Sequence, residues 1–316
     1  MGRAPGTRPI TQAGLRRQAW KFYFVVLAWP ACCVALPGVH AAIGWWSLLF
    51  MLFPGAFLLN WAALLMHECW HRYVPNIDNR AFYNLLAWML LNDPQLFRLL
   101  HPAHHSRVST WEDREVHPFG DIRSRPLKVF NNALELTLGM LYIVLAWHIV
   151  VPSHPAYRKQ YRVGSLVVAA LAIAGFLALV FAASRSAFGL SAAEVAVPLA
   201  ASYWLGGMVL HYSTLIQHGN LIVAGGLHER NRWVRSLSAA GPIEVLFLVL
   251  SHQDQVVHHT EPSVYARPFR NNLVARPSGA VVISARDFLT IAWDMLLGRD
   301  TAHARLGTRM PGELKT

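Results

Sequence analysis

The sequence predicts an all-α integral membrane protein, with four transmembrane helices in two hairpins and a cytoplasmic helical cap. One observation is composition: the 316 residues are 54% hydrophobic and only 14% charged, against about 25% charged in ordinary soluble domains. Another is that long stretches contain no charged residue. A third is that Lys and Arg gather in the connections between those stretches. These observations exclude a soluble globule, a disordered chain and a coiled coil.

The first hairpin is predicted between Lys21 and His67, an interval without Asp, Glu, Lys or Arg. Its length suffices for two crossings of about 20 residues each. The tripeptide Leu36-Pro37-Gly38 interrupts the interval, and adjacent Pro and Gly are a typical turn signal. We therefore expect crossings at about 20–36 and 41–66.

The second hairpin is predicted at about 163–184 and 193–213. The first of these stretches has no charged residue, and the second carries only Glu194 at its edge. The apolar stretch at about 136–151 is shorter than a crossing needs, so we expect a helix at the membrane interface there.

The distribution of basic residues predicts the orientation. The chain has 28 Lys and Arg against 17 Asp and Glu, a net charge of +11. The basic residues gather in the N-terminal tail (1–19) and in 72–162, and the two short loops hold almost none. By the positive-inside rule both termini and 72–162 are cytoplasmic. We expect one multi-pass domain over 20–298 in the cytoplasmic membrane, a tail at 299–316 and no nucleic-acid partner.

An amphipathic helix is predicted near the C-terminus. Four apolar residues fall on one of its faces, and Ser284 with Asp287 resembles a capping box at its start. Gly298 is a plausible end. The apolar residues are Phe288, Ile291, Ala292 and Met295.

Histidine is unusually abundant: seven of the 16 histidines stand in three motifs, and His218 lies between the second and third of these. Residues three and four apart share one face of a helix, and Pro102 suits a first helical position. His218 ends the fourth predicted crossing, so the predicted topology places the whole set on the cytoplasmic side. The motifs are HECWH with His67 and His71, HPAHH with His101, His104 and His105, and QVVHH with Gln255, His258 and His259.

This histidine set predicts a metal centre. Neutral imidazole is a good ligand for iron, copper, zinc and nickel, and so many histidines exceed what one tetrahedral zinc needs. Two metal ions are the economical explanation. A single pair such as His67 and His71 could instead be an ordinary core pair, but three motifs together are hard to explain in that way.

The three motifs resemble those of the integral-membrane fatty acid desaturase and hydroxylase superfamily. The resemblance covers about residues 41–265 and implies a four-crossing core with a cytoplasmic site of two non-haem irons. It assigns the motif histidines as iron ligands and gives His218 the position of an additional one. Gln255 stands where many members have His, which leaves His211 or His252 as a candidate further ligand. The implied ligands are His67, His71, His101, His104, His105, His218, His258 and His259.

Acidic residues beside the motifs could orient the imidazole rings through the second ring nitrogen. The candidates are Glu68, Glu112, Asp113 and Asp254, and the STWEDRE stretch that holds two of them is similar to an acidic segment common in the superfamily. Each of these residues could equally be a solvated surface charge.

The resemblance implies an enzyme that uses O2 to attack an unactivated C–H bond of a fatty acyl or other lipid chain. Desaturation is the first expectation; lipid or alkyl hydroxylation and oxidative decarboxylation are alternatives. The sequence has no dinucleotide fingerprint, haem attachment motif or iron–sulfur cysteine set. We therefore expect electrons from a separate ferredoxin, rubredoxin or cytochrome, with a basic cytoplasmic face favouring an acidic partner.

Two other interpretations account for less of the sequence. HECWH is also a literal HExxH motif, in which His67 and His71 bind zinc and Glu68 is the general base of an intramembrane protease. That interpretation assigns no role to HPAHH or QVVHH. A histidine relay in a metal or haem transporter predicts polar residues along the crossings, which are nearly free of charge.

Overall fold

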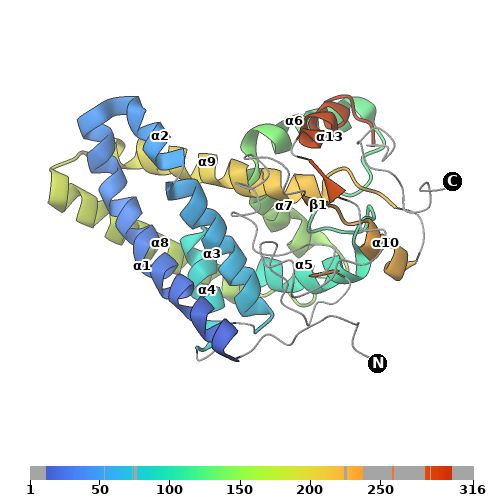
Figure 1. Ribbon diagram of the computed structural model, residues 1–316, viewed down its shortest axis with the longest axis horizontal. Coiled ribbons are helices and arrows are strands. Elements are labelled where there is room, and N and C mark those ends of the chain that lie inside the picture. Colours follow the sequence, from blue (N-terminus) through green and yellow to red (C-terminus); the bar gives the residue numbers. More distant parts are fainter. Residues whose placement is uncertain are drawn as a thin grey trace. The chain divides into compact units, whose positions relative to one another are not determined.

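The computed structural model describes residues 12–52, 54–72, 74, 77–223, 226–237, 258–259, 282–284 and 286–300. These residues form two compact units: the long-helix unit, from 12–99 and 151–210, and the histidine unit, from 100–150 and 211–300. Helices dominate both units, as predicted (Figure 1). The candidate residues Asp254, His252 and Gln255 lie outside the described residues.

The long-helix unit begins with α1 (Gln12–Ile43), which contains Pro37 and Gly38. The turn predicted at these two residues is therefore wrong. The chain turns later, in the short 3-10 helix η1 (Gly44–Trp46), where Gly44 has φ +59°, a backbone conformation that glycine adopts at little cost. Two further helices follow, α2 (Ser47–Leu52) and α3 (Pro54–Trp70).

Packing, not a turn, explains Gly38. A Cβ atom at this position would lie 2.8 Å from the Phe188 ring, which is closer than van der Waals contact permits. Phe188 is the last residue of α8 (Val163–Phe188). Glycine thus allows α1 and α8 to approach closely, and membrane helices tolerate an internal proline such as Pro37.

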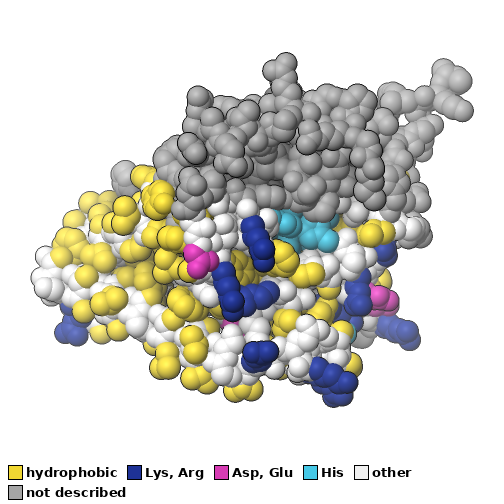
Figure 2. All heavy atoms as spheres, turned by 90° about the horizontal axis from the view of Figure 1, so that it is seen from below, with side chains coloured by type: hydrophobic (Ala, Val, Ile, Leu, Met, Phe, Trp, Pro, Cys, Tyr) yellow, Lys and Arg dark blue, Asp and Glu magenta, His cyan; other side chains and the backbone are white. Residues whose placement is uncertain are grey.

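Among the described residues, three segments are long and apolar enough to cross a membrane: Tyr23–Leu49, Val163–Phe188 and Ala192–His218. The last two are α8 and α9 (Ala192–His218), and both predicted crossings of the second hairpin lie within them. Large apolar side chains on α8 point outward, with Leu171 68% and Leu179 72% exposed; hydrophobic side chains cover much of the left part of the face in Figure 2. The second predicted crossing, at about 41–66, stays a prediction, because α3 has only 17 residues.

Polar contacts join the helices of this unit. The Tyr203 hydroxyl donates to the Met89 carbonyl oxygen at 2.7 Å and accepts from the Trp29 indole at 3.3 Å. Met89 ends α4 (Asn79–Met89), whose first turn is capped by the Asp78 carboxylate. Because buried polar groups need partners, these bonds favour one packing of α1, α4 and α9.

The histidine unit contains α6 (Arg125–Leu138) and α7 (Met140–Ser153), separated by Gly139 with φ +58°. The interfacial helix predicted at about 136–151 therefore begins later, at Met140. Further along lie α10 (Leu227–Trp233) and a parallel pair of two-residue strands, β1 (Ser236–Leu237) and β2 (Val282–Ile283).

The predicted amphipathic helix near the C-terminus is α13 (Asp287–Leu296). Its buried residues Ile291 and Met295 pack with Leu215, Ile216 and Ile283. The Asp287 carboxylate accepts from the backbone N–H of Ser284 at 2.7 Å, and Gly298 has φ +63° just after the helix. The predicted contact between Ser284 and Asp287 is therefore present, but the cap residue is Arg286, which makes no side-chain cap hydrogen bond. Gly298 follows the helix as predicted, and α13 covers the end of α9.

Candidate metal centre

The second histidine motif lies on α5 (Pro94–Arg107). Pro94 occupies the first helical position, and the Asp93 carboxylate accepts from the Gln95 N–H at 2.9 Å. Pro102 lies inside this helix, so the prediction that it begins one is wrong. The helix begins two turns earlier because Asp93-Pro94 supplies both the cap and the fixed φ of a helix start.

Two groups of imidazoles form within the histidine unit. In the first group, ligand nitrogens of His101, His105 and His258 lie within 4.8 Å of one another. In the second group the same holds for His104, His218 and His259, all of them buried. The Nε2 atoms of His101 and His105 are 3.1 Å apart, and those of His104 and His259 are 3.3 Å apart.

Each histidine doublet is divided between the two groups. His105 and His258 belong to the first group, and their chain neighbours His104 and His259 belong to the second. Consecutive residues of an α-helix point about 100° apart. A doublet therefore directs one ring to each group. This geometry explains why two of the motifs contain adjacent histidines.

The first motif lies at the end of α3, in the long-helix unit, with His71 one residue after the helix. The His67 and His71 rings are neighbours, with centroids 4.6 Å apart, as their spacing predicts. Phe97 lies beside His67, with ring centroids 6.1 Å apart. Glu68, the candidate general base of the protease interpretation, is buried.

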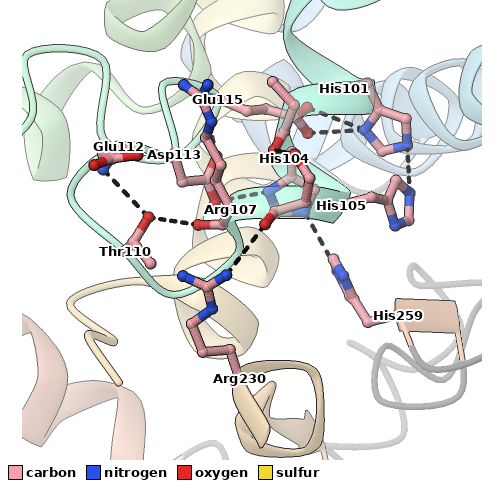
Figure 3. Close-up of polar contacts among 12 residues, drawn as sticks. His101, His104, His105, Arg107, Thr110, Glu112, Asp113, Glu115, Arg230 and His259 are labelled. Atoms are coloured by element: carbon pink, nitrogen blue, oxygen red, sulfur yellow. Dashed lines mark hydrogen bonds and ion pairs between the residues drawn. The ribbon is translucent and has the colours of Figure 1, made fainter. Parts of the chain in front are cut away.

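Two carboxylates hold rings of the α5 motif (Figure 3). Nδ1 of His104 lies 2.8 Å from an Asp113 oxygen, and Nδ1 of His101 lies 3.0 Å from a Glu115 oxygen. An ionised carboxylate only accepts, so Nδ1 of each ring carries the hydrogen and Nε2 of the neutral ring carries a lone pair. Those lone pairs are directed into the two histidine groups.

The loop after α5 keeps the two carboxylates in place. The Trp147 indole donates to the Glu115 carbonyl oxygen at 3.1 Å. The Thr110 hydroxyl donates to the Arg107 carbonyl oxygen at 2.7 Å. The Arg230 guanidinium donates to the Ser106 carbonyl oxygen at 3.2 Å (Figure 3). Backbone contacts thus fix the loop on both sides of Asp113.

Burial and charge move the pKa values of these groups in opposite directions. Burial of His104 disfavours its charged form, but Asp113 and Glu115 outweigh burial and raise the pKa of His104 to about 9. Burial raises the pKa of Glu115 to about 7, against the opposing effect of His104. Burial and the neighbouring histidines lower the pKa of His259, so that ring is neutral.

These residues fit first-row transition metals. Each group offers three imidazole nitrogens close enough to share one ion. Rings fixed by a carboxylate at Nδ1 and open at Nε2 are the usual arrangement of metal-binding histidines. Nδ1 of His259 is buried and has no hydrogen-bond partner among the described residues, which fits a ring placed to bind a metal.

Two other candidates have no place in the histidine groups of the described residues. Glu112 is exposed and has no histidine partner among the described residues. His211 falls in neither histidine group of the described chain; its Nε2 lies 3.1 Å from a Glu135 oxygen. Sequence reasoning missed Glu115, although it lies in the same STWEDRE stretch, two residues after Asp113.

Comparison with known proteins adds one finding. The family model described as fatty acid desaturase matches residues 43–270, a range that contains all three histidine motifs and His218. Comparison with curated proteins gives no significant match.

Proposed function

Because the chain belongs to the fatty acid desaturase family, we propose that it is a membrane-bound diiron enzyme that uses O2 to desaturate a fatty acyl or other lipid chain. The observation that carries the proposal is the pair of histidine groups, each with a ring fixed by a carboxylate. The apolar segments long enough to cross a membrane, three of them in the part of the chain that the structure describes, support a lipid substrate.

We assign the irons to the histidines as follows. His101, His105 and His258 would hold one iron, and the resemblance to the family adds His67 and His71 of the first motif to the ligand set. His104, His218 and His259 would hold the other. Only nitrogen ligands are assigned, because Asp113 and Glu115 are engaged with ring nitrogens.

A diiron centre with O2 supplies an oxidant strong enough to take hydrogen from an unactivated C–H bond, which no side chain does alone. Desaturation removes two hydrogens from adjacent carbons and, with O2, two electrons and two protons, yields a double bond and two waters. The protein contributes fixed ligands and buried surroundings: His104, His258 and His259 are at most 3% exposed. Exclusion of water from these surroundings limits the side reactions of a strong oxidant.

The electrons come from a separate ferredoxin, rubredoxin or cytochrome. The motifs and both termini face the cytoplasm, where such donors occur, and the chain crosses the membrane several times. The net charge of +11 favours an acidic donor, because complementary charge accelerates encounter.

The test is expression of the chain with a suitable reductase, followed by mass spectrometry of cellular lipids and metal analysis of the purified protein. We expect two irons per chain and a new double bond. An added oxygen would indicate hydroxylation, and a chain shortened to a terminal alkene would indicate decarboxylation. About one zinc per chain without iron would contradict the proposal and favour the HExxH protease.

Substitution of single ligands gives a second test. His104→Ala and His258→Ala each remove a ligand and should abolish lipid oxidation while membrane insertion persists. His148→Ala is the matched control, because His148 bonds the Val144 carbonyl oxygen and belongs to neither histidine group. Retained turnover in either ligand variant would count against the diiron assignment.

A further inference from the structure

A cavity of about 560 Å³ lies in the long-helix unit beside the first histidine motif. Cys69 and Trp70, which stand between His67 and His71, form part of its lining. The remainder comes from the segment after α3, from the start of α4 and from Arg98 on α5. A volume of this size is typical of small-molecule sites.

Three arginines line this cavity: Arg72, Arg80 and Arg98. None of them has a carboxylate within 4.0 Å among the described residues. The single acidic residue in the lining, Asp78, is engaged as the cap of α4, accepting from the backbone N–H of Arg80 at 2.9 Å. The cavity therefore holds a surplus of positive charge.

Arg98 is positioned in advance of any ligand. Its guanidinium donates to the Asn84 side-chain oxygen at 2.9 Å and lies over the Tyr83 ring at 5.3 Å. Tyr83 is buried, and its hydroxyl donates to the Pro94 carbonyl oxygen. A guanidinium held in this way loses less freedom when an anion binds it.

Arg72 has a backbone conformation that does not suit arginine. It follows α3 with φ +60°, in the left-handed region where glycine is the usual residue after a helix. Strained residues of this kind cluster at functional sites. Here the strained residue contributes a charge to the cavity wall.

We propose that this cavity binds the anionic head group, a phosphate or a carboxylate, of the lipid that the enzyme oxidises. Planar guanidinium groups bind both anions through paired hydrogen bonds. The inference rests on the proposed lipid oxidation and specifies its substrate as an anionic lipid, held by its head beside His67 and His71.

The experiment measures equilibrium binding of three amphiphiles of equal chain length to the purified full-length chain. The probes are hexadecyl phosphate, palmitate and hexadecanol, with inorganic phosphate as a chain-free competitor. We expect at least one anionic amphiphile to bind about tenfold more tightly than the alcohol, as one charge-assisted contact would give. The tighter of the two anions identifies the head group as phosphate or carboxylate.

Variants locate the effect. Arg80→Gln and Arg98→Gln should each remove most of the tenfold preference, and Arg158→Gln, which removes an exposed arginine outside the cavity, should leave it unchanged. Arg72→Gly removes the charge and also relieves the backbone strain, so it should weaken anion binding without lowering thermal stability. That variant separates loss of binding from loss of folding.

Equal affinity for the alcohol and both anions would overturn the inference. The inference would also be overturned if Arg80→Gln and Arg98→Gln left the preference for the anionic amphiphile undiminished. A third contradicting result would be an affinity for inorganic phosphate, measured by competition, that equals the affinity for hexadecyl phosphate. Iron content and lipid oxidation are measured on the same samples. A chain that holds iron and turns over lipid without a head-group preference would refute only the proposed head-group site. A head-group preference in a chain without iron would refute the proposed reaction.

Discussion

His104 shows how a single residue is prepared for a metal. Asp113 fixes its Nδ1 side at 2.8 Å, and its Nε2 lies 3.3 Å from that of His259. In the metal-free chain the same carboxylate holds a proton on the ring, since Asp113 and Glu115 raise the pKa of His104 to about 9 against the effect of burial. A metal ion must displace that proton to bind.

Metal affinity should therefore depend on pH. Because the pKa of His104 is raised, the ring is protonated below pH 9, and affinity should rise by about tenfold per pH unit from pH 7 and level off near pH 9. Titration of the metal-free protein with Co²⁺ checks this. Asp113→Asn lowers the pKa of His104 and should flatten the dependence; an affinity independent of pH in the unsubstituted chain would contradict the prediction.

The sequence identifies the histidines better than the residues that support them. The spacing of His101, His104 and His105 places them on one side of α5, and the structure divides them between the two groups, with His101 and His105 in one and His104 in the other. Glu115 could not be chosen over Glu112 in the same way, because both lie in a loop whose path depends on contacts such as that of Trp147 with the Glu115 backbone.

At the scale of elements, α1 shows where local signals mislead. Pro37 and Gly38 are equally compatible with a turn and with a close helix contact, and the distinction depends on Phe188, 150 positions further along the chain. The helix α13 is the contrasting case. The Ser284–Asp287 contact at its start and its apolar face are local properties, so the sequence predicts the helix correctly.

Two glycine substitutions test the packing explanation. Gly38→Ala places a methyl group against the Phe188 ring and should lower the free energy of unfolding by about 1–3 kcal/mol. Gly175→Ala, on α8 with no atom within 4 Å of the added Cβ, should be neutral or stabilising by about 1 kcal/mol. Thermal unfolding in detergent measures both. Equal effects at the two sites would show that Gly38 does not serve close packing.

At the scale of the whole molecule, composition predicts the protein class, and charge predicts its orientation. Composition cannot fix the number of crossings. The charge-free interval after Lys21 is long enough for two, but α1 alone extends to Ile43, and α2 and α3 divide what remains. The helix boundaries, not the total apolar length, determine which segments can cross.

Orientation can be tested by labelling single cysteines in a chain whose Cys32, Cys33 and Cys69 are replaced by alanine. We expect Ser186→Cys, near the end of α8, to react with a membrane-impermeant maleimide in intact cells. Ser106→Cys, exposed on α5, should react only after permeabilisation. Labelling of Ser106→Cys in intact cells would place the metal centre on the outer side and refute the predicted orientation.

The division of the His104–His105 doublet between two groups has a mechanical consequence. Neighbouring Cα atoms are about 3.8 Å apart whatever the rest of the protein does, so His104 and His105 enter the two groups from adjacent anchors on α5. If each group held one iron as proposed, a shift of α5 would move a ligand of both ions together. A change in a surrounding loop would alter one group at a time, whereas an insertion or deletion within α5 would disturb both.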